Sequence, residues 1–350
     1  RSVSAFLLNR SSDLLVYYDN STGHISVLQR EDGEELVFLA DTLLGSTSNP
    51  IMLVNSGEEV QMLQLKKGWN WLSFYMKPEK NTISNLLNRS TQWEVGDALE
   101  VLGTNGFYEI SYKGIQDPKN PSRINYFWDN GNDSIELDAT KMYRFYSCNE
   151  KTAYLSGNGY YEYINVHQGW NRVAYISHLN LPIATALADY TANATVGDII
   201  KSQSEFSMLV EDTQGNRMWK GTLTHLTAGQ GYMIKHVGTN DVIFYYPSYE
   251  GASRYGNLKH HAPMYENNTG CSMNIVARTA GVDLQEGDCL VAFNGAEICG
   301  VAEKSDDDLF YLSVGDYGND ALSFAIQRGE ELIALSGNMM TYMTDAVIGN

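Results

Sequence analysis

The stretch Gly68-Trp69-Asn70-Trp71 is followed 101 residues later by Gly169-Trp170-Asn171-Arg172, which repeats its first three residues. The same shift of 101 residues relates Val95-Gly96-Asp97 to Val196-Gly197-Asp198. Two separate motifs therefore agree on one register, which indicates a duplicated unit. Self-similarity at a fixed period is typical of proteins that use one structural module more than once.

The duplication divides the middle of the chain into two β repeat units, residues 59–156 and 157–250. In each unit a strand leads to the Gly-Trp-Asn triplet, which we interpret as a tight turn, and further strands follow it. Short runs rich in β-branched and aromatic residues, separated by Gly, Asn and Asp, predict these strands.

One short helix is expected in each unit. In the first unit, residues 83–87 carry apolar side chains at helical spacing, with Asn81 or Thr82 as the cap. In the second unit the helix is expected from Pro182 through Ala188, because the donor that proline lacks would be unpaired in a first helical turn anyway.

The flanking segments complete an all-β architecture. Residues 271–350 contain six short strands spaced about ten residues apart, which favours a β-sandwich. Residues 1–58 form a short β module, and its segment 29–36 resembles 327–332, so we expect a shorter relative of the C-terminal module. Residues 251–270 are polar and are expected to be a linker. The predicted fold is therefore a tandem of β-rich modules with one short helix each, flanked by β-sandwich-like modules.

The charge of the chain limits the classes of partner that it can bind. The formal net charge is −18, which disfavours nucleic acids and anionic membrane surfaces, because both require clustered Lys and Arg. No run reaches the length of about 18 apolar residues that a membrane-spanning helix needs. Arg1 opens the chain without an initiator Met or a leader, so we expect a mature product or an excised segment.

The four cysteines do not form a C-x-x-C metal or redox pair. Cys289 and Cys299 flank Asn294-Gly295, a signal for a tight hairpin. A two-residue turn would place Cys299 opposite Leu290, facing away from Cys289, whereas a three-residue loop would put both cysteines on one face. A disulfide between them stays an open alternative.

The tryptophans allow two interpretations. Trp69 and Trp170 recur at one position of the repeat, so we expect them to be core anchors of their units. Arg172 replaces Trp71 in the second unit, which indicates a surface or unit-specific role there. In the alternative interpretation, flat aromatic faces stack on sugar rings, and at least two indoles lie exposed in one groove. The candidate ligand-binding residues for that alternative are Trp71, Trp93, Trp128 and Trp219.

Catalytic and metal-binding motifs are missing from the sequence. It contains no G-x-S-x-G, H-E-x-x-H, P-loop or G-x-G-x-x-G pattern, and its histidines are scattered. The acidic segments around 129–136, 306–308 and 316–320 lack the ordered ligands of a calcium loop and fit solvated turns. A carboxylate pair for glycoside hydrolysis stays open, because its members need only meet in space. We predict no enzyme, no cofactor and no metal.

The motif at Gly68 to Ser73, together with Val95 to Asp97 and Gly229 to Ile234, resembles repeats of large secreted or outer-surface proteins of Bacteroidales-type bacteria. The last module is similar to a domain that accompanies those repeats, through the runs at 288–293 and 299–302. The resemblance implies export to the surface, without an activity to transfer residue by residue.

The sequence thus predicts a non-enzymatic structural or adhesive segment of an extracellular or cell-surface protein. Its expected partners are glycans or other surface proteins, with no nucleic acid and no insertion into a membrane. Two alternatives remain: a carbohydrate-binding module, and accessory domains of a secreted glycoside hydrolase or protease.

Overall fold

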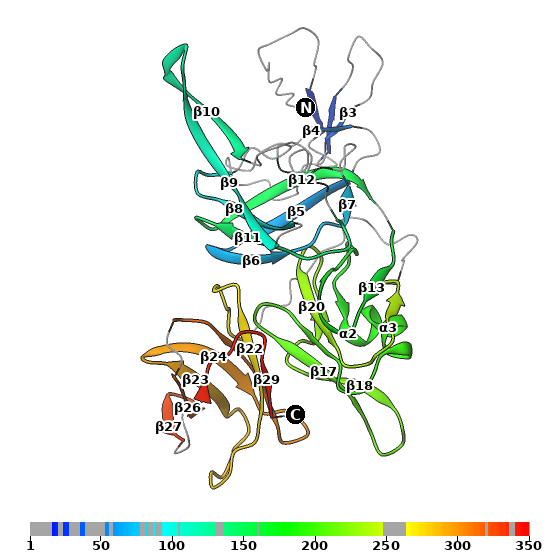
Figure 1. Cartoon of the computed structure of the whole chain (residues 1–350), viewed down its shortest axis with the longest axis vertical. Helices are drawn as coiled ribbons and strands as arrows, with labels where there is room; N and C mark the ends of the chain where they lie inside the picture. Colours follow the sequence, from blue (N-terminus) through cyan, green and yellow to red (C-terminus); the bar gives the residue numbers. More distant parts are fainter. Residues whose placement is uncertain are drawn as a thin grey trace.

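The computed structural model of the chain describes residues 16–19, 24–27, 36–38, 53–55, 59–77, 82, 87, 93–103, 106–129, 136, 138–159, 161–247, 264–318, 321–335 and 340–349. These residues are mostly β-strands with short helices, so the predicted all-β class is confirmed. No helix among them is long and apolar enough to cross a membrane. Figure 1 shows the modules, which we call unit 1 (59–159), unit 2 (161–247) and the C-terminal module (271–349).

Unit 1 consists of two antiparallel sheets. Its strands are β5 (Glu59–Leu65), β6 (Gly68–Leu72), β7 (Met76–Lys77), β8 (Ala98–Gly103), β9 (Gly106–Asp117), β10 (Asn120–Asp129), β11 (Tyr143–Ser147) and β12 (Lys151–Gly159). The larger sheet has the order β10-β9-β8-β11-β6, and the smaller has the order β5-β12-β7. Because β12 continues to pair through Gly159, unit 1 extends slightly beyond residue 156.

Unit 2 repeats this topology. Its elements are β13 (Ile164–Val166), β14 (Gly169–Ala174), β15 (Leu181–Pro182), α2 (Ile183–Ala186), α3 (Ala188–Asn193), β16 (Ile199–Lys201), β17 (Phe206–Glu211), β18 (Arg217–Gly221), β19 (His225–Leu226), β20 (Gly231–His236) and β21 (Val242–Phe244). Its larger sheet has the order β18-β17-β16-β20-β14, strand for strand the order of unit 1. The second sheet, β13-β21, corresponds to β5-β12. The two middle segments are therefore copies of one scaffold.

The helix expected in unit 2 is present as α2 and α3, directly after Pro182. The chain continues helically past the predicted end at Ala188, because Ile183, Ala186, Leu187 and Tyr190 all bury into the core. The helix expected at 83–87 in unit 1 lies outside the described residues except for Leu87.

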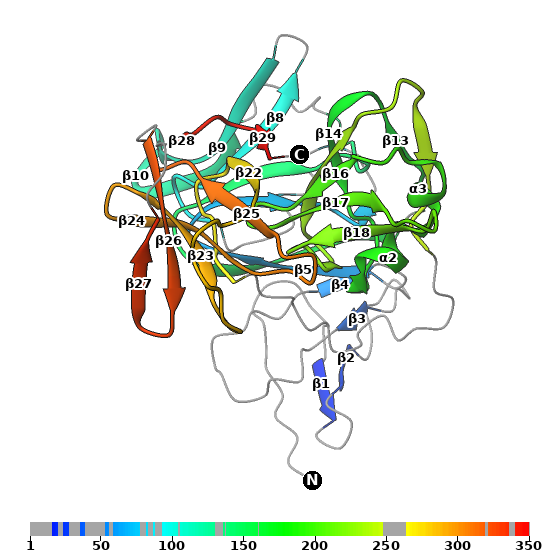
Figure 2. The same cartoon turned by 90° about the horizontal axis from the view of Figure 1, so that it is seen from below.

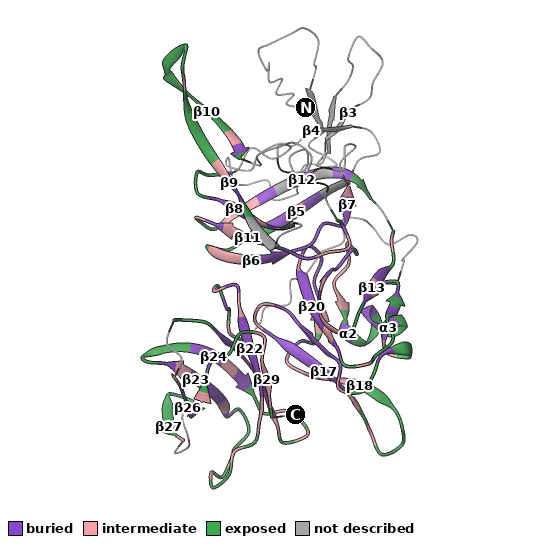
Figure 3. Ribbon diagram, in the orientation of Figure 1, coloured by how far each residue is buried: buried purple, intermediate pink, exposed green. Residues whose placement is uncertain are grey.

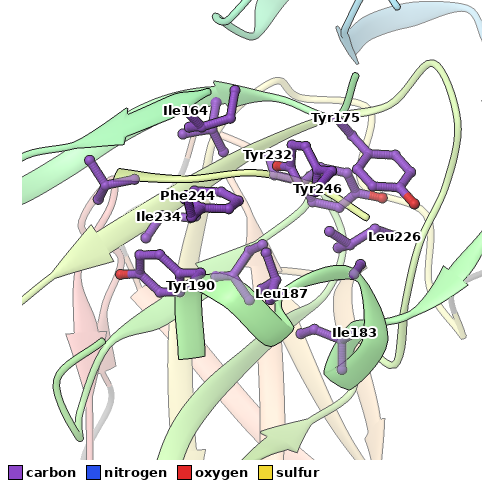
Figure 4. Close-up of a cluster of buried hydrophobic side chains, with 14 of the residues drawn as sticks. Ile164, Tyr175, Ile183, Leu187, Tyr190, Leu226, Tyr232, Ile234, Phe244 and Tyr246 are labelled. Carbon is purple, nitrogen blue, oxygen red and sulfur yellow. The ribbon is translucent and has the colours of Figure 1, made fainter. Parts of the chain in front are cut away.

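Each unit has its own hydrophobic core. In unit 2 four tyrosines and Phe244 fill the space between α2, α3 and the sheets (Figure 4); the tyrosines are Tyr175, Tyr190, Tyr232 and Tyr246. In unit 1 the indoles of Trp93 and Trp128 meet edge to face, with 5.5 Å between ring centroids. Large buried aromatic side chains contribute most to such cores.

The C-terminal module contains two packed sheets. Its strands are β22 (Ser272–Ala277), β23 (Cys289–Asn294), β24 (Glu297–Glu303), β25 (Phe310–Gly315), β26 (Ala321–Arg328), β27 (Glu331–Ala334), β28 (Met340–Thr341) and β29 (Val347–Ile348). All six predicted strands are present. The sheet orders are β25-β22-β29 and β24-β23-β26-β27, and β29 runs parallel to β22. Figure 2 shows the module beside unit 2, viewed from below.

The N-terminal segment contributes a four-stranded antiparallel sheet in the order β1-β2-β3-β4. Its strands are β1 (Val16–Asp19), β2 (His24–Val27), β3 (Leu36–Phe38) and β4 (Leu53–Asn55). Its relation to the C-terminal module stays a prediction.

Cys289 and Cys299 are both free thiols. Asn294 pairs with Glu297, so the turn holds Gly295 and Ala296, and the pairing then skips Cys299 opposite Ala292 and Phe293. Leu290 therefore lies opposite Ala302, and not opposite Cys299 as predicted for a two-residue turn. Cys299 is buried in the core, where burial raises its pKa to about 12, whereas Cys289 is partly exposed.

Candidate functional site

The Gly-Trp-Asn motif is built identically in both units. Gly68 and Gly169 have φ angles of +98° and +92°, which favour glycine. The Asn70 side chain accepts a hydrogen bond from Lys66 N at 2.9 Å and donates to the carbonyls of Lys66 and Gly68. Asn171 makes the corresponding bonds. The motif therefore opens strands β6 and β14, with the bend just before the tryptophan, rather than lying within a tight turn.

The repeated tryptophans lie at the boundary between modules, which corrects their prediction as core anchors. Trp170 is half-buried and packs against Trp71, Met142 and Met233 on one side. On its other side it joins a cluster that includes Tyr311 of the C-terminal module. The indole is thus surrounded by residues that lie far apart in the sequence.

Trp69 has the same kind of environment in unit 1. The Arg144 guanidinium lies 4.8 Å from its ring centroid. Gly270 belongs to a segment that packs against Trp69. A Cβ atom added at Gly270 would lie 2.7 Å from the indole, so only glycine fits there. Both repeat tryptophans therefore contact a neighbouring part of the chain.

The free edge of strand β6 is closed by groups from outside unit 1. Trp69 N donates to Asn268 O at 3.1 Å, Trp71 N to Gln203 Oε1 at 3.1 Å, and Ser73 N to Gly229 O at 2.9 Å. These alternate amides are the ones that an edge strand leaves unpaired. Hydrogen bonds donated to unit 2 and to residues 264–270 therefore satisfy this edge of the unit 1 sheet.

Lys201 is the buried charge of this junction. Its ammonium group donates to Ser272 O, Ser272 Oγ and, at 2.6 Å, Asp345 Oδ1 of the C-terminal module. It also lies 4.8 Å from the Trp170 ring centroid and 5.7 Å from that of Trp71. Burial lowers the pKa of Lys201, and the Asp345 carboxylate opposes this shift. One side chain thus joins unit 2 to the C-terminal module.

Glu100 occupies the position of Lys201 in unit 1, 101 residues earlier, and joins unit 1 to unit 2. Its carboxylate accepts from Arg144 at 3.0 Å and from Arg172 of unit 2 at 2.8 Å. Arg172 is the residue that replaces Trp71 in the second repeat, and its unit-specific role is this contact.

The segment expected to be a linker is packed into the same junction where it is described, from Met264 onward. Asn267 is buried and its side chain donates to Gln203 O and Cys271 O. Its backbone amide donates to Ser204 Oγ at 2.9 Å. This part of the chain is a structural strap between the modules.

A cavity of about 310 Å³ opens between unit 1, unit 2 and this strap. Its polar lining includes Gln64, Gln203 and Glu205, and an ion pair joins Lys66 to Glu266. Two carboxylates, Glu205 and Glu266, are in the lining, and the part of the chain that the structure describes has no group of three or more His, Cys, Asp or Glu that could hold a metal ion.

The structure does not bring the four candidate sugar-binding tryptophans together. Trp71, Trp93 and Trp128 are 5%, 7% and 4% exposed, and the last two belong to the core of unit 1. Trp219 is half-buried, stacks on Tyr190 and donates to Thr191 Oγ1 at 2.9 Å. The exposed groove that this alternative requires is not formed by these indoles, because they pack inside modules and at the junction.

An exposed tyrosine surface in unit 2 was not predicted. Tyr161, Tyr163 and Tyr245 are 58%, 46% and 43% exposed, and Ile243 beside them is 55% exposed. The Tyr161 and Tyr245 rings stack with 5.3 Å between centroids, and Tyr163 meets Tyr245 edge to face. Alternation along β13 and β21 points Ile164, Val166 and Phe244 into the core and leaves the tyrosines outside. The sequence signal was the dense spacing of tyrosines at 160–163 and 245–246.

No family model matches the chain, and neither the curated proteins nor the solved structures contain a match to it.

Proposed function

We propose that the chain is a non-enzymatic structural segment of an extracellular or cell-surface protein, which holds its modules in a fixed arrangement and presents binding surfaces at its exterior. The junction around Lys201 and Trp170 supports this proposal best. Three parts of the chain contribute to it, and its charged and polar groups are used in contacts between modules. A spacer or adhesive segment benefits from such rigidity because less conformational freedom is lost on binding.

Small-angle X-ray scattering of the whole chain and of a Lys201→Ala/Trp170→Ala variant tests the proposal. The wild-type profile should agree with the fixed arrangement in Figure 1, and the variant should expand because unit 2 and the C-terminal module separate. A wild-type profile that requires freely moving modules would contradict the spacer role. Turnover of a glycan or peptide by the purified chain would contradict the non-enzymatic role, and protease protection of the protein on intact source cells would contradict surface exposure.

The tyrosine surface supports glycan binding as a second candidate function. Exposed aromatic faces stack on the C–H faces of sugars, and hydroxyl and carboxylate groups around them can bind sugar hydroxyls. Asp189 lies beside this surface, where its carboxylate accepts a hydrogen bond from Tyr245 N at 2.8 Å. Its negative charge favours neutral sugars over anionic ones.

A glycan array with neutral oligosaccharides tests this second candidate. Binding by the wild-type chain should be lost in a Tyr161→Ala/Tyr245→Ala variant and kept in Tyr317→Ala, which removes an exposed tyrosine of the C-terminal module. Equal loss in both variants, or no binding by the wild-type chain, would contradict a tyrosine platform.

A further inference from the structure

The hairpin of β9 and β10 extends far beyond the sheet to which it belongs. Strands β9 and β10 are 12 and 10 residues long, whereas the corresponding β17 and β18 of unit 2 have 6 and 5. Strand β8 pairs with β9 only as far as Ser111. Residues 113–127, which we call the arm, therefore form a two-stranded ribbon that projects from unit 1 (Figure 1).

The arm exposes an apolar strip on one face. Ile124 and Tyr126 on this face are 51% and 55% exposed, Ile115 on the opposite face is 54% exposed, and Figure 3 shows the projecting part of the hairpin as exposed. Tyr126 stacks on Tyr112, with 6.1 Å between ring centroids, which continues the buried aromatic cluster outward along one face. Gly114 leaves room for the side chains of Ile124 and Tyr126 on that face. Isolated two-stranded ribbons are marginally stable in water, so a strip of this kind favours a partner.

The charge of the arm is opposite to that of the chain. It holds Lys113, Lys119 and Arg123 against Asp117, a formal charge of +2, while the whole chain carries −18. Lys113 forms an ion pair with Asp129, and no described carboxylate pairs with Lys119 or Arg123. Two arms would repel each other, whereas the rest of a second copy carries a net formal charge of −20, the −18 of the chain less the +2 of its arm. Charge complementarity thus favours a second copy of this chain, bound through a different surface.

Strand β27 is the complementary surface that the structure offers. It lies at the edge of the sheet β24-β23-β26-β27, and Leu332 on it is 53% exposed. Glu330 and Glu331 precede Leu332 and form no ion pair among the described residues. By contrast, Asp306 and Asp308 in the acidic turn of the same module already pair with Lys220 and Lys304. Figure 1 places β10 and β27 toward opposite ends of the long axis.

We propose that the arm of one copy docks along the β27 edge of a second copy, so that copies associate head to tail. Edge strands pair readily through their free backbone groups, and here the apolar strip and opposite charges would set the partner and direction. Because donor and acceptor are different surfaces, the contact does not close on itself in a dimer, and chains of copies result.

Sedimentation velocity over a concentration series tests this proposal with the full chain. The wild-type protein should form growing assemblies that weaken as salt is raised, because screening shortens the range of the charges. An arm variant, Lys119→Glu/Arg123→Glu, and an edge variant, Glu330→Lys/Glu331→Lys, should each associate at least about tenfold more weakly. Lys67→Glu/Lys304→Glu, which changes the total charge as the arm variant does, should assemble like the wild-type chain.

Mixing the arm and edge variants gives the sharpest result. The edge variant keeps a native arm and the arm variant keeps a native β27 edge, and their two reversed surfaces are also opposite in charge, so the mixture should assemble again although neither variant does so alone. A monomeric wild-type chain at all concentrations, an arm variant that still assembles, or a mixture that stays monomeric would overturn the proposal. Binding of the arm to a different protein or a glycan by a monomeric wild-type chain would overturn it as well.

Discussion

At the scale of single residues, repeat positions that hold the same residue in both units have a different role from positions that hold different residues. Asn70 and Asn171 keep the same hydrogen bonds and so define the scaffold. Glu100 and Lys201 occupy matching positions with opposite charges, and each joins its unit to the next module. The scaffold thus depends on what the repeats share, and the junction depends on where they differ.

The importance of Lys201 for the junction predicts a specific loss of stability. Lys201→Ala removes the charge-assisted hydrogen bonds to Ser272 and Asp345 and the packing beneath Trp170. We expect the free energy of unfolding to fall by about 2 kcal/mol, at the lower end for such bonds because Asp345 is partly exposed and screened by solvent. Urea titration measures the change.

Lys235→Ala is the matched control, because Lys235 also lies over the Trp170 ring, at 5.9 Å, and forms no ion pair with a described carboxylate. Its free energy of unfolding should change by less than about 0.5 kcal/mol. Equal effects of the two substitutions would show that Lys201 acts only as a cation above the indole.

The sequence made the duplicated Gly-Trp-Asn motif evident, but it predicted neither the position of the motif at the start of a strand nor the surroundings of the tryptophans. Local motifs determine local bends, and the shared spacing made the duplication evident. The neighbours of Trp69 and Trp170 come from segments up to about two hundred residues away, such as Gly270, and no local pattern encodes them. The stacking of Tyr161 on Tyr245 could not be predicted for the same reason, because the two residues meet only in the folded unit.

At the scale of elements, one turn recurs before a strand in three modules. Asp97, Asp198 and Asp288 each follow a glycine with positive φ, and each carboxylate accepts from the backbone amide three residues earlier. A basic side chain from a neighbouring segment completes each site: Lys151, His236 and Arg328. The third occurrence was not recognised in the sequence, because it shares only Gly-Asp with the other two.

The Asp288 site predicts a pH dependence of the C-terminal module. Hydrogen bonds from Arg328 and from Gln285 N lower the pKa of Asp288 from 3.8 to about 2. The folded state therefore binds fewer protons than the unfolded state between these values. The stabilisation is complete above pH 3.8 and is lost as the pH falls toward 2.

Asp288→Asn should accordingly unfold at a lower urea concentration than the wild-type chain at neutral pH, and the difference should shrink as the pH falls from 3.8 to about 2. Asp283→Asn is the control, since only the backbone carbonyl of Asp283 accepts from Arg328. A difference that stays constant across this pH range would contradict the account of the turn.

Most strands and the helix of unit 2 were predictable from the alternation and spacing of apolar residues. The length of the arm was not. Pro118, Pro121 and the polar residues between them are typical of loops, so no local pattern predicts that the two strands extend this far. The ribbon forms by backbone pairing across those residues, with the register shift between Asn120 and Ile124 accommodating the irregular part.

At the scale of the whole molecule, the modules are joined by more than side-chain contacts. Backbone hydrogen bonds cross from β6 to residues 229 and 268, and Ala174 N donates to Thr140 O in the other unit. Met142 packs so closely on Gly231 that a Cβ atom there would come within 2.1 Å. Opening one boundary would leave buried polar groups unpaired, so the modules should unfold together.

Native-state hydrogen exchange of the full chain at low denaturant tests this central claim most directly. Amides in β11, β20 and β22, one strand from each of the three modules, should exchange through one opening with the same free energy and the same dependence on denaturant. Three different free energies with smaller denaturant slopes would show that the modules open independently, and would contradict a single locked assembly.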